Sequence, residues 1–234
     1  MMISVIIPVY NEKNTILEII SKINSVNIKK EIIIVDDYST DGTREILETL
    51  KNADYKILFH DKNLGKGAAI KTAKKKISGD IVIIQDADLE YNPKDYPKLI
   101  EPIFKKEVDV VYGSRVLGSS RYLMQNFSSI YRIFFNHMLT ILSNFINKQS
   151  LTDAHTCYKV FSSEVFNSIN LEENDFSFCP EITTKIALKK IKIKEISIDY
   201  NGRSYKEGKK IKITDGIKAI KTLFKYRYFK NESK

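Results

Sequence analysis

Apolar runs that stop abruptly at acidic side chains constrain the fold of this chain most strongly. Continuous apolar segments rich in β-branched residues predict four strands, at residues 2–8, 31–35, 55–60 and 81–84. The segments between them repeat apolar residues at helical spacing, at residues 14–26, 43–50 and 68–76. Strands that alternate with helices and carry no polar face belong to sheets covered on both sides. We therefore expect an α/β fold with a mostly parallel, Rossmann-like sheet and helices on both faces.

The fourth predicted strand leads directly into three crowded carboxylates. Asp86, Asp88 and Glu90 follow Ile84 at a spacing of two residues, which places them on one side of an extended backbone. Acids this close repel one another unless a cation lies between them. A hard divalent metal that keeps open positions for phosphate oxygens is the natural cation for such a site. The alternative is a solvated acidic turn after a core strand.

Polar side chains follow other predicted strands as well. They are Tyr10 and Glu12 after the first strand, Asp36 and Asp37 after the second, and Asp86 and Asp88 after the fourth. In parallel sheets, ligands bind beyond the carboxyl ends of the strands. One site at one edge of the sheet would collect all six side chains.

The second half of the chain is less regular. It predicts strands at residues 108–112, 156–161 and 191–200, and helices at residues 93–106 and 181–188. The aromatic-rich segment 124–146 has two readings, a core helix or a helix lying in a membrane interface. Residues 214–230 predict a basic amphipathic helix, which either docks on anionic lipid or packs on the domain with a solvated basic face. We expect one domain, residues 1–212, an extension, residues 213–234, and peripheral attachment to a membrane surface.

Composition narrows the partners and the setting. A net charge of +9 over 234 residues indicates an anionic partner, but no basic segment matches a nucleic-acid motif, so nucleic acid is not expected. No apolar run is long enough to span a bilayer, and the chain starts directly with a strand, so no signal peptide is expected. Cys157 and Cys179 make no disulfide framework, and a cytoplasmic location follows as the default. The oligomeric state stays open.

A glycine pair, Gly65-Lys66-Gly67, opens the third predicted helix. Backbone amides at such a helix start can cradle a phosphate. The spacing matches neither the Walker loop nor the dinucleotide fingerprint, and a tight turn into a helix explains it equally well. The predicted chemistry is therefore acids with a metal, rather than a lysine-and-glycine phosphate nest.

Longer motifs narrow the reading to one family. The first half holds Pro8-Val9-Tyr10-Asn11-Glu12, Val35-Asp36-Asp37-Tyr38-Ser39-Thr40-Asp41-Gly42-Thr43, Asn63-Leu64-Gly65-Lys66-Gly67-Ala68 and Gln85-Asp86-Ala87-Asp88-Leu89-Glu90. In order and spacing they resemble the family-2 glycosyltransferases of GT-A fold. The second half holds Gly113-Ser114-Arg115, Asp153 with Thr156-Cys157-Tyr158-Lys159-Val160-Phe161, Pro180-Glu181, and Tyr200-Asn201-Gly202-Arg203-Ser204-Tyr205 with Glu207-Gly208-Lys209-Lys210-Ile211. These look like the dolichyl- or polyprenyl-phosphate hexosyltransferase branch, the dolichyl-phosphate mannose synthase type.

The resemblance implies roles for particular residues. It gives the nucleotide of a sugar donor a pocket lined by Pro8, Tyr10, Glu12, Val35 and Asp37. It brings the ribose and diphosphate to Asp86, Ala87 and Asp88, and gives Mg²⁺ or Mn²⁺ the ligands Asp86, Asp88 and Glu90. The implied catalytic residues are Asp88, Arg115 and Arg203, and the two arginines would bind the acceptor phosphate or the donor diphosphate. Lys209 would lie in a loop that closes over the donor.

The leading hypothesis is a metal-dependent inverting transferase. It would move a hexose from a nucleotide sugar, GDP-mannose or a UDP-sugar, to a dolichyl or polyprenyl phosphate on the cytosolic membrane face. A lipid phosphate is already ionised, so its attack needs no general base. The alternative is a hydroxyl acceptor in polysaccharide or glycan synthesis, which needs a carboxylate base such as Asp153, Asp175 or Glu181.

Two other classes fit the sequence less well. A binding module with a decayed site is disfavoured because the Asp-x-Asp motif is intact. A nucleotidyltransferase would carry a glycine-rich signature with Arg and Lys after the first strand, where this chain has Pro-Val-Tyr-Asn-Glu.

Overall fold

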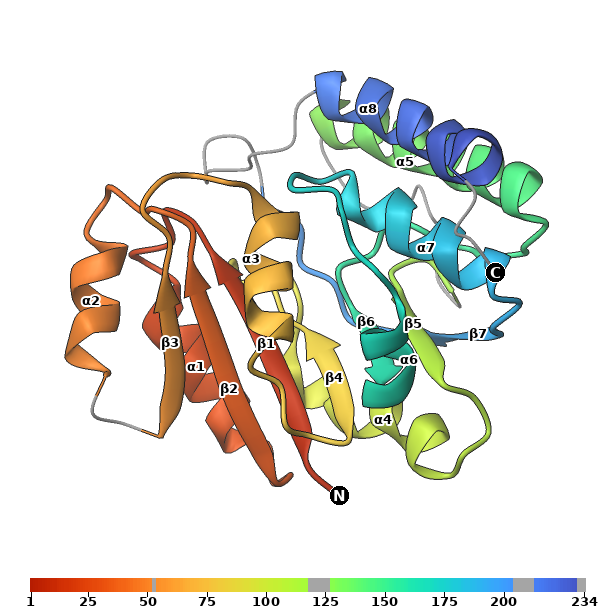
Figure 1. The fold of residues 1–234 in the computed structure, drawn as a ribbon. Coiled ribbons are helices and arrows are strands. Elements are labelled where there is room, and N and C mark those ends of the chain that lie inside the picture. Colours follow the sequence, from red (N-terminus) through yellow and green to blue (C-terminus); the bar gives the residue numbers. More distant parts are fainter. Residues whose placement is uncertain (52–53, 118–126, 204–212, 231–234) are drawn as a thin grey trace.

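A computed structural model of the chain describes residues 1–51, 54–117, 127–203 and 213–230, without the side chains of residues 127–132 and 213. Within these ranges a seven-stranded sheet forms the centre of the molecule (Figure 1). Its strands are β1 (Ile3–Val9), β2 (Lys30–Asp36), β3 (Tyr55–Phe59), β4 (Ile81–Ile84), β5 (Val110–Ser114), β6 (Lys159–Ser162) and β7 (Ile193–Ser197). They lie in the order β3-β2-β1-β4-β6-β5-β7.

Helices connect the strands and surround the sheet. They are α1 (Ile16–Ser25), α2 (Thr43–Thr49), α3 (Lys66–Lys74), α4 (Tyr96–Phe104) after a 3₁₀ turn (Pro93–Asp95), α5 (Phe127–Asn147), α6 (Ser163–Ser168), α7 (Phe178–Leu188) and α8 (Ile213–Phe224), which continues into a π-helical segment (Lys225–Phe229). The short helix α6 was not expected. The predicted α/β fold is confirmed.

All neighbouring strands of the sheet are parallel except those that pair with β6. β1 pairs parallel with β2 and β4, β2 with β3, and β5 with β7, whereas β6 runs antiparallel between β4 and β5. The predicted mostly parallel sheet is therefore confirmed. The register places Val5 beside both Ile32 and Ile83. Because β1 is central, the carboxyl ends of β2 and β4 lie on either side of its own.

Both faces of the central strands are covered, which explains their continuous apolar sequences. α1 and α3 lie on opposite faces of the sheet (Figure 1). α1 buries Ile16, Ile19, Ile20 and Ile23, which repeat at helical spacing on one side of the helix. The four residues of β4 are all buried. Each isoleucine withdrawn from water in this way contributes about 1.5–3 kcal/mol to folding.

The helices α5, α7 and α8 pack together beyond the strands. α5 and α8 run side by side at the top of Figure 1, the end toward which β1 and β2 point. Leu223 of α8 and Tyr226 of the π-helical segment are buried, so the extension packs against the rest of the chain. In the described part of the chain, no helix combines the length and the apolar content that crossing a bilayer requires. The division into residues 1–212 and 213–234 stays a prediction.

A buried ion pair anchors α7. Lys185 and Glu181 have fully buried side chains, with Lys185 Nζ 3.0 Å from Glu181 Oε1. Glu181 also accepts the backbone N–H groups of Glu172 at 2.7 Å and Glu173 at 2.9 Å. The pair therefore ties α7 to the loop that precedes it.

Removing one partner of this pair should destabilise the fold. We expect Lys185→Met to lower the free energy of unfolding by about 3–5 kcal/mol, because the Glu181 carboxylate is left buried without its cation. Lys189→Met is the matched control, since Lys189 is exposed at the end of the same helix; it should stay within about 0.5 kcal/mol of the unsubstituted protein. Urea denaturation measures both, and equal midpoints for the two variants would contradict the expectation.

Candidate active site

Side chains from the ends of β1 and β4 meet at one guanidinium. Arg203 donates to both carboxylate oxygens of Glu12, with N···O distances of 3.1 and 3.0 Å. The same Arg203 group lies 3.2 Å from Asp88 Oδ2. Glu12 follows β1 and Asp88 follows β4, so the adjacency of these parallel strands brings the two acids together. Arg203 belongs to the segment after β7, which is the strand at one edge of the sheet.

The acids after β4 lie on a turn, not on the extended backbone that the sequence predicted. β4 ends at Ile84, and Leu89 has a φ of 63°, in the left-handed region. Asp88 Oδ1 accepts the backbone N–H of Glu90 at 3.1 Å and so holds the turn. A short polar side chain that bonds the backbone two residues on is a typical turn former.

The surroundings of Asp88 disfavour its charged form. Burial, and then the neighbouring Asp86 and Glu90 carboxylates, raise the pKa of Asp88 to about 7, although Arg203 acts in the opposite direction. The side chain nevertheless remains 16% exposed. A carboxylate with this pKa gains from any further cation placed beside it.

Asp86 lies in a different electrostatic environment from Asp88. Its Oδ1 accepts from Lys66 Nζ at 2.5 Å. Burial alone would raise the pKa of Asp86, but the charge and hydrogen bond of Lys66, together with smaller contributions from Cys157 and Lys159, lower this pKa. The Lys66 ammonium also lies 3.7 Å from the Cys157 thiol. The charge of Asp86 is thus neutralised by Lys66, which lies between the two glycines at the start of α3.

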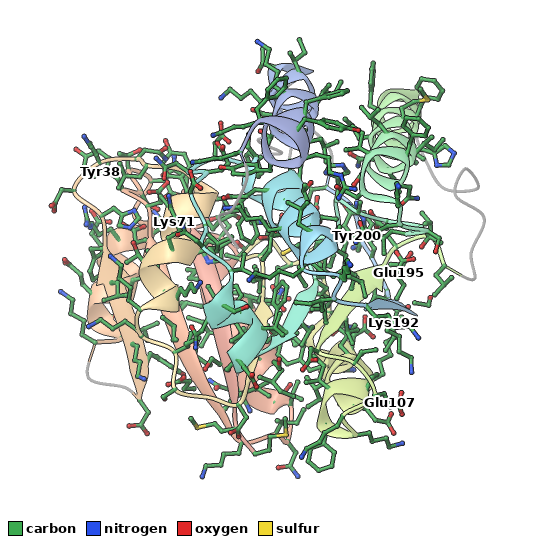
Figure 2. The ribbon with its side chains drawn as sticks, turned by 45° about the vertical axis from the view of Figure 1, so that its right-hand side comes forward. Tyr38, Lys71, Glu107, Lys192, Glu195 and Tyr200 are labelled. Atoms are coloured by element: carbon green, nitrogen blue, oxygen red, sulfur yellow. The ribbon has the colours of Figure 1, made fainter. Side chains whose placement is uncertain are left out.

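Glu90 is held by the segment that follows β7. Its carboxylate accepts from the Tyr200 hydroxyl at 2.8 Å and from the backbone N–H of Arg203 at 2.7 Å. β7 was expected to run to residue 200 but ends at Ser197. The chain leaves the sheet there because the N–H of Asp199 binds Asp95 and Tyr200 pairs with Tyr91, next to the acids. Tyr200 is labelled in Figure 2.

The carboxylates fit a divalent metal that is shared with a ligand, rather than one caged by protein. Within the described residues, no group of three or more His, Cys, Asp and Glu side chains could hold a metal ion. Mg²⁺ commonly binds through one or two carboxylates together with substrate phosphates. Asp88, with its raised pKa and partial exposure, matches that kind of ligand, and Asp86 lies beside it. The metal trio Asp86, Asp88 and Glu90 stays a prediction.

The residues expected around the nucleotide lie at or next to the ends of the same strands. Pro8 is in β1, Val35 is in β2 with a fully buried side chain, and Ala87 is buried beside Asp88. Tyr10 is half-buried just after β1. Their contacts with a nucleotide stay a prediction.

Asp37 joins β2 to the glycine pair. Its carboxylate accepts the backbone N–H groups of Leu64 at 2.9 Å and Gly65 at 2.7 Å, and lies 2.7 Å from His60 Nδ1. The other ring nitrogen of His60 lies 2.9 Å from the Thr72 hydroxyl. Asp37 therefore attaches the loop before Lys66 to the carboxyl end of β2.

Arg115 is held by a second bidentate pair. Its Nε and Nη2 donate to the two oxygens of Asp153 at 2.7 and 2.8 Å. The guanidinium also lies over the Tyr200 ring, 5.2 Å from the centroid. Tyr200 thus separates Arg115 from Glu90. Lys209 falls outside the described residues.

The comparisons with known proteins decide the family. The model of the family described as "Glycosyl transferase family 2" matches residues 4–169 of this chain. The chain belongs to glycosyl transferase family 2. The matched region includes the acids after β1, β2 and β4, whereas Arg203 lies beyond it.

Two curated relatives of this family 2 glycosyl transferase carry names that refer to lipid phosphates. The chain is 29% identical over 97% of its length to a dolichol-phosphate mannosyltransferase of Pyrococcus furiosus, of which it covers 62%. It is 28% identical over 88% of its length to an undecaprenyl-phosphate 4-deoxy-4-formamido-L-arabinose transferase of Edwardsiella ictaluri, of which it also covers 62%. The chain thus spans less than two thirds of the length of these relatives. They support the polyprenyl-phosphate hexosyltransferase branch.

Solved structures support the GT-A fold of the transferase. A glucosyl-3-phosphoglycerate synthase from Mycobacterium tuberculosis, in complex with Mg²⁺ and UDP, superposes with a TM-score of 0.71 at 18% identity. The match covers 99% of this chain and 81% of the other. Complexes of the same enzyme with Mn²⁺ and UDP superpose similarly, with TM-scores of 0.70 and 0.68. At this level of identity the likeness carries the fold alone.

Two residues of the transferase site were missed from the sequence. Lys66 was considered only as part of a loop whose backbone amides meet phosphate, whereas its ammonium pairs with Asp86. Tyr200 was placed in a strand, whereas its hydroxyl binds Glu90. The lysine between two glycines was the only signal for Lys66. A contact between positions 90 and 200 leaves no signal in a single sequence.

The raised pKa of Asp88 predicts a pH-dependent cost to stability. The native state holds the Asp88 proton more tightly than the unfolded chain does, so stability from this group falls as pH rises from about 4 toward 7 and stays low above that. At pH 8 in a chelator, Asp88→Asn should raise the free energy of unfolding by roughly 1–2 kcal/mol. At pH 5 the difference should be smaller or vanish. Urea denaturation at both pH values measures the difference in unfolding free energy between the variant and the unsubstituted protein. A gain in stability that is smaller at pH 8 than at pH 5 would contradict the prediction.

Proposed function

We propose that the chain transfers a hexose from a nucleotide sugar to a polyprenyl phosphate, with a divalent metal and with inversion at the anomeric carbon. The observation that carries this proposal is the meeting of Glu12 and Asp88 at Arg203, beside Asp86 and Lys66. Acids and cations of this kind suit a diphosphate leaving group. The names of the curated relatives support the acceptor class.

On the donor side, acids and cations have complementary tasks. Pro8, Tyr10, Glu12, Val35, Asp37 and Ala87 would line the nucleotide pocket. Asp88, with Asp86 and Glu90 as the other candidate ligands, would hold Mg²⁺ or Mn²⁺. Such a metal supplies a Lewis acid for the oxygens that gain charge as the glycosidic bond breaks.

The chain's own cations would stabilise the same developing charge. Arg203 lies 3.2 Å from Asp88 Oδ2, so its guanidinium would place a positive charge beside the oxygens of a diphosphate bound there. Lys66 supplies a second positive charge next to Asp86. Fixed donors aimed at the position where charge develops are usually the largest single source of rate enhancement.

On the acceptor side, the contacts favour an acceptor that brings its own charge. Asp153 is paired with Arg115, Asp175 with Lys218 at 2.7 Å, and Glu181 is buried against Lys185. All three carboxylates proposed as bases for a hydroxyl acceptor are thus engaged. A phosphate monoester needs no base, so the engagement of these carboxylates does not count against it. A hydroxyl acceptor is the second candidate function, supported by a relative named as a low-salt glycan biosynthesis hexosyltransferase.

Substitution of Asp88 tests the chemistry. Asp88→Ala should lower hexose transfer by roughly 10²–10³-fold. The variant would lose a ligand of the metal that stabilises the charge developing on the diphosphate. The assay follows radiolabelled sugar from GDP-mannose and UDP-sugars into an organic extract containing polyprenyl phosphate. Asp61→Ala is the control, since Asp61 is exposed and lies outside the site. Full activity of Asp88→Ala without added metal would rule out the mechanism, and label that stays in water would favour the hydroxyl acceptor.

The exposed face of α5 supports a membrane surface as partner. α5 turns its polar residues inward, with Thr140, Ser143 and Asn147 buried. Five of its apolar residues are exposed, although Ile146 is buried, and the exposed ones are Phe134, Phe135, Met138, Ile141 and Phe145. A helix on a water-exposed surface does not usually present so many large apolar side chains to solvent. Phe229 of the π-helical segment and Phe145 are 83% and 82% exposed.

Positive charge near these helices suits an anionic bilayer. A cleft of about 1020 Å³ is lined by residues from the end of α5, the end of α7, β7 and the π-helical segment, among them Lys148, Lys190, Lys192 and Arg227. Basic groups near the surface attract acidic lipid headgroups. We therefore place the chain peripherally on the cytosolic face of a membrane, with the apolar side of α5 in the interface.

Liposome flotation tests this placement. Phe145→Ser combined with Phe229→Ser should reduce recovery with acidic liposomes by roughly tenfold or more, since each buried aromatic ring is worth about 1.5–3 kcal/mol. Phe104→Ser is the matched control, because Phe104 is 62% exposed on α4. Equal flotation of all three proteins, or no flotation of the unsubstituted protein, would contradict membrane docking.

A further inference from the structure

A short acidic loop, residues 172–175, lies between α3 and the C-terminal helix, which comprises α8 and the π-helical segment together (residues 213–229). On the α3 side, the carbonyl oxygen of Asn174 accepts the backbone N–H of Ala68 at 2.9 Å. Lys71, labelled on α3 in Figure 2, donates to Asn174 Oδ1 at 2.5 Å and to the carbonyl oxygen of Glu172 at 2.7 Å. The acidic loop is therefore bonded to the first two turns of α3.

The glycines on either side of Lys66 let this loop approach. A Cβ at Gly65 would lie 2.5 Å from the Asn174 carbonyl oxygen, and a Cβ at Gly67 would overlap that of Glu173. Any side chain at either position would push the loop away. The close approach explains this glycine pair without a phosphate. It also sets the backbone from which Lys66 reaches Asp86.

On its other side, the acidic loop receives lysines from the C-terminal helix. Lys218 pairs with Asp175 at 2.7 Å, Lys225 pairs with Glu173 at 2.6 Å, and Lys230 pairs with Glu172. The Tyr226 hydroxyl adds a 2.8 Å hydrogen bond to Glu173. Three lysines of one helical segment thus match three acids of one loop.

Burial makes the middle of this contact the firmest part. Tyr226 is 1% exposed, and its ring lies over the ammonium of Lys185, 4.5 Å from the centroid. Lys185 in turn is ion-paired with Glu181, which holds the backbone N–H groups of Glu172 and Glu173. Buried and paired groups hold a loop more firmly than exposed ion pairs do.

We propose that Glu173 and Asn174 are positioning residues for Lys66, and that the C-terminal helix sets them through Lys225 and Tyr226. The path runs from Lys225 to Glu173, through the backbone of Asn174 to the start of α3, and from Lys66 to Asp86. The consequence for donor binding rests on the proposed function. The contact between the loop and α3 does not.

The first test measures the link without any ligand. Hydrogen exchange of the Ala68 amide reports its bond to Asn174 directly. Lys225→Gln and Tyr226→Phe should each raise that exchange rate by roughly three- to tenfold. Lys221→Gln is the matched control, since Lys221 of the same helix makes no ion pair within the described residues. Unchanged exchange in both variants would overturn the proposal.

The second test asks whether the effect passes through Lys66. The affinity for UDP and GDP with Mn²⁺ is measured by calorimetry for Lys225→Gln, Lys66→Gln and the double variant. Lys225→Gln should weaken binding by roughly three- to tenfold alone and add nothing to Lys66→Gln, because coupled sites are not additive. Additive losses would overturn the positioning role. Faster Ala68 exchange in a protein that binds neither nucleotide would keep the loop contact and refute the donor proposal instead.

Discussion

Crowded carboxylates beyond two adjacent parallel strands, β1 and β4, are the constraint on which the rest of the structure depends. Glu12, Asp86 and Asp88 cannot share one partly desolvated edge unless positive charge lies between them. The cations come from two distant segments: Lys66 opens α3, and Arg203 follows β7. The second half of the chain therefore completes a site whose acids belong to the first half, and the bridge between Tyr91 and Tyr200 fixes where it does so.

The C-terminal helix has a place in two sets of contacts. Its lysines pair with the acidic loop, while Arg227 of its π-helical end lines the same cleft as the end of α5 and Phe229 is exposed. An ammonium that pairs with Glu173 is not at the same time available to a lipid phosphate. The attraction to acidic headgroups therefore falls to the basic residues of the cleft between α5 and β7.

The sequence predicted those parts of the molecule that local pattern controls. β1, β2 and β4 and the acids after them follow from apolar runs that end in polar residues, and β4 was placed correctly at both ends. The end of β7 was not, because contacts of Asp199 and Tyr200 with residues more than 100 positions away draw the chain out of the sheet. The sequence left two readings of α5 open, since an apolar stripe looks the same whether it faces a core or a bilayer. The structure shows that Thr140, Ser143 and Asn147 are buried while Phe134, Phe135 and Phe145 are exposed.

The two acids of the Asp-x-Asp motif differ in their electrostatic environment because, among the described residues, only Asp86 pairs with a lysine. Lys66 lowers the pKa of Asp86, whereas the pKa of Asp88, two residues on, is raised to about 7 by burial and by its acidic neighbours. Titratable groups whose environments push their pKa values apart take different roles in a site. Asp86 has Lys66 as its counter-ion at 2.5 Å, whereas Asp88 shares Arg203 with Glu12 and keeps a raised pKa. The pairing with Lys66 therefore makes the two carboxylates electrostatically different, and the glycines that allow the acidic loop to approach α3 fix the backbone from which Lys66 extends.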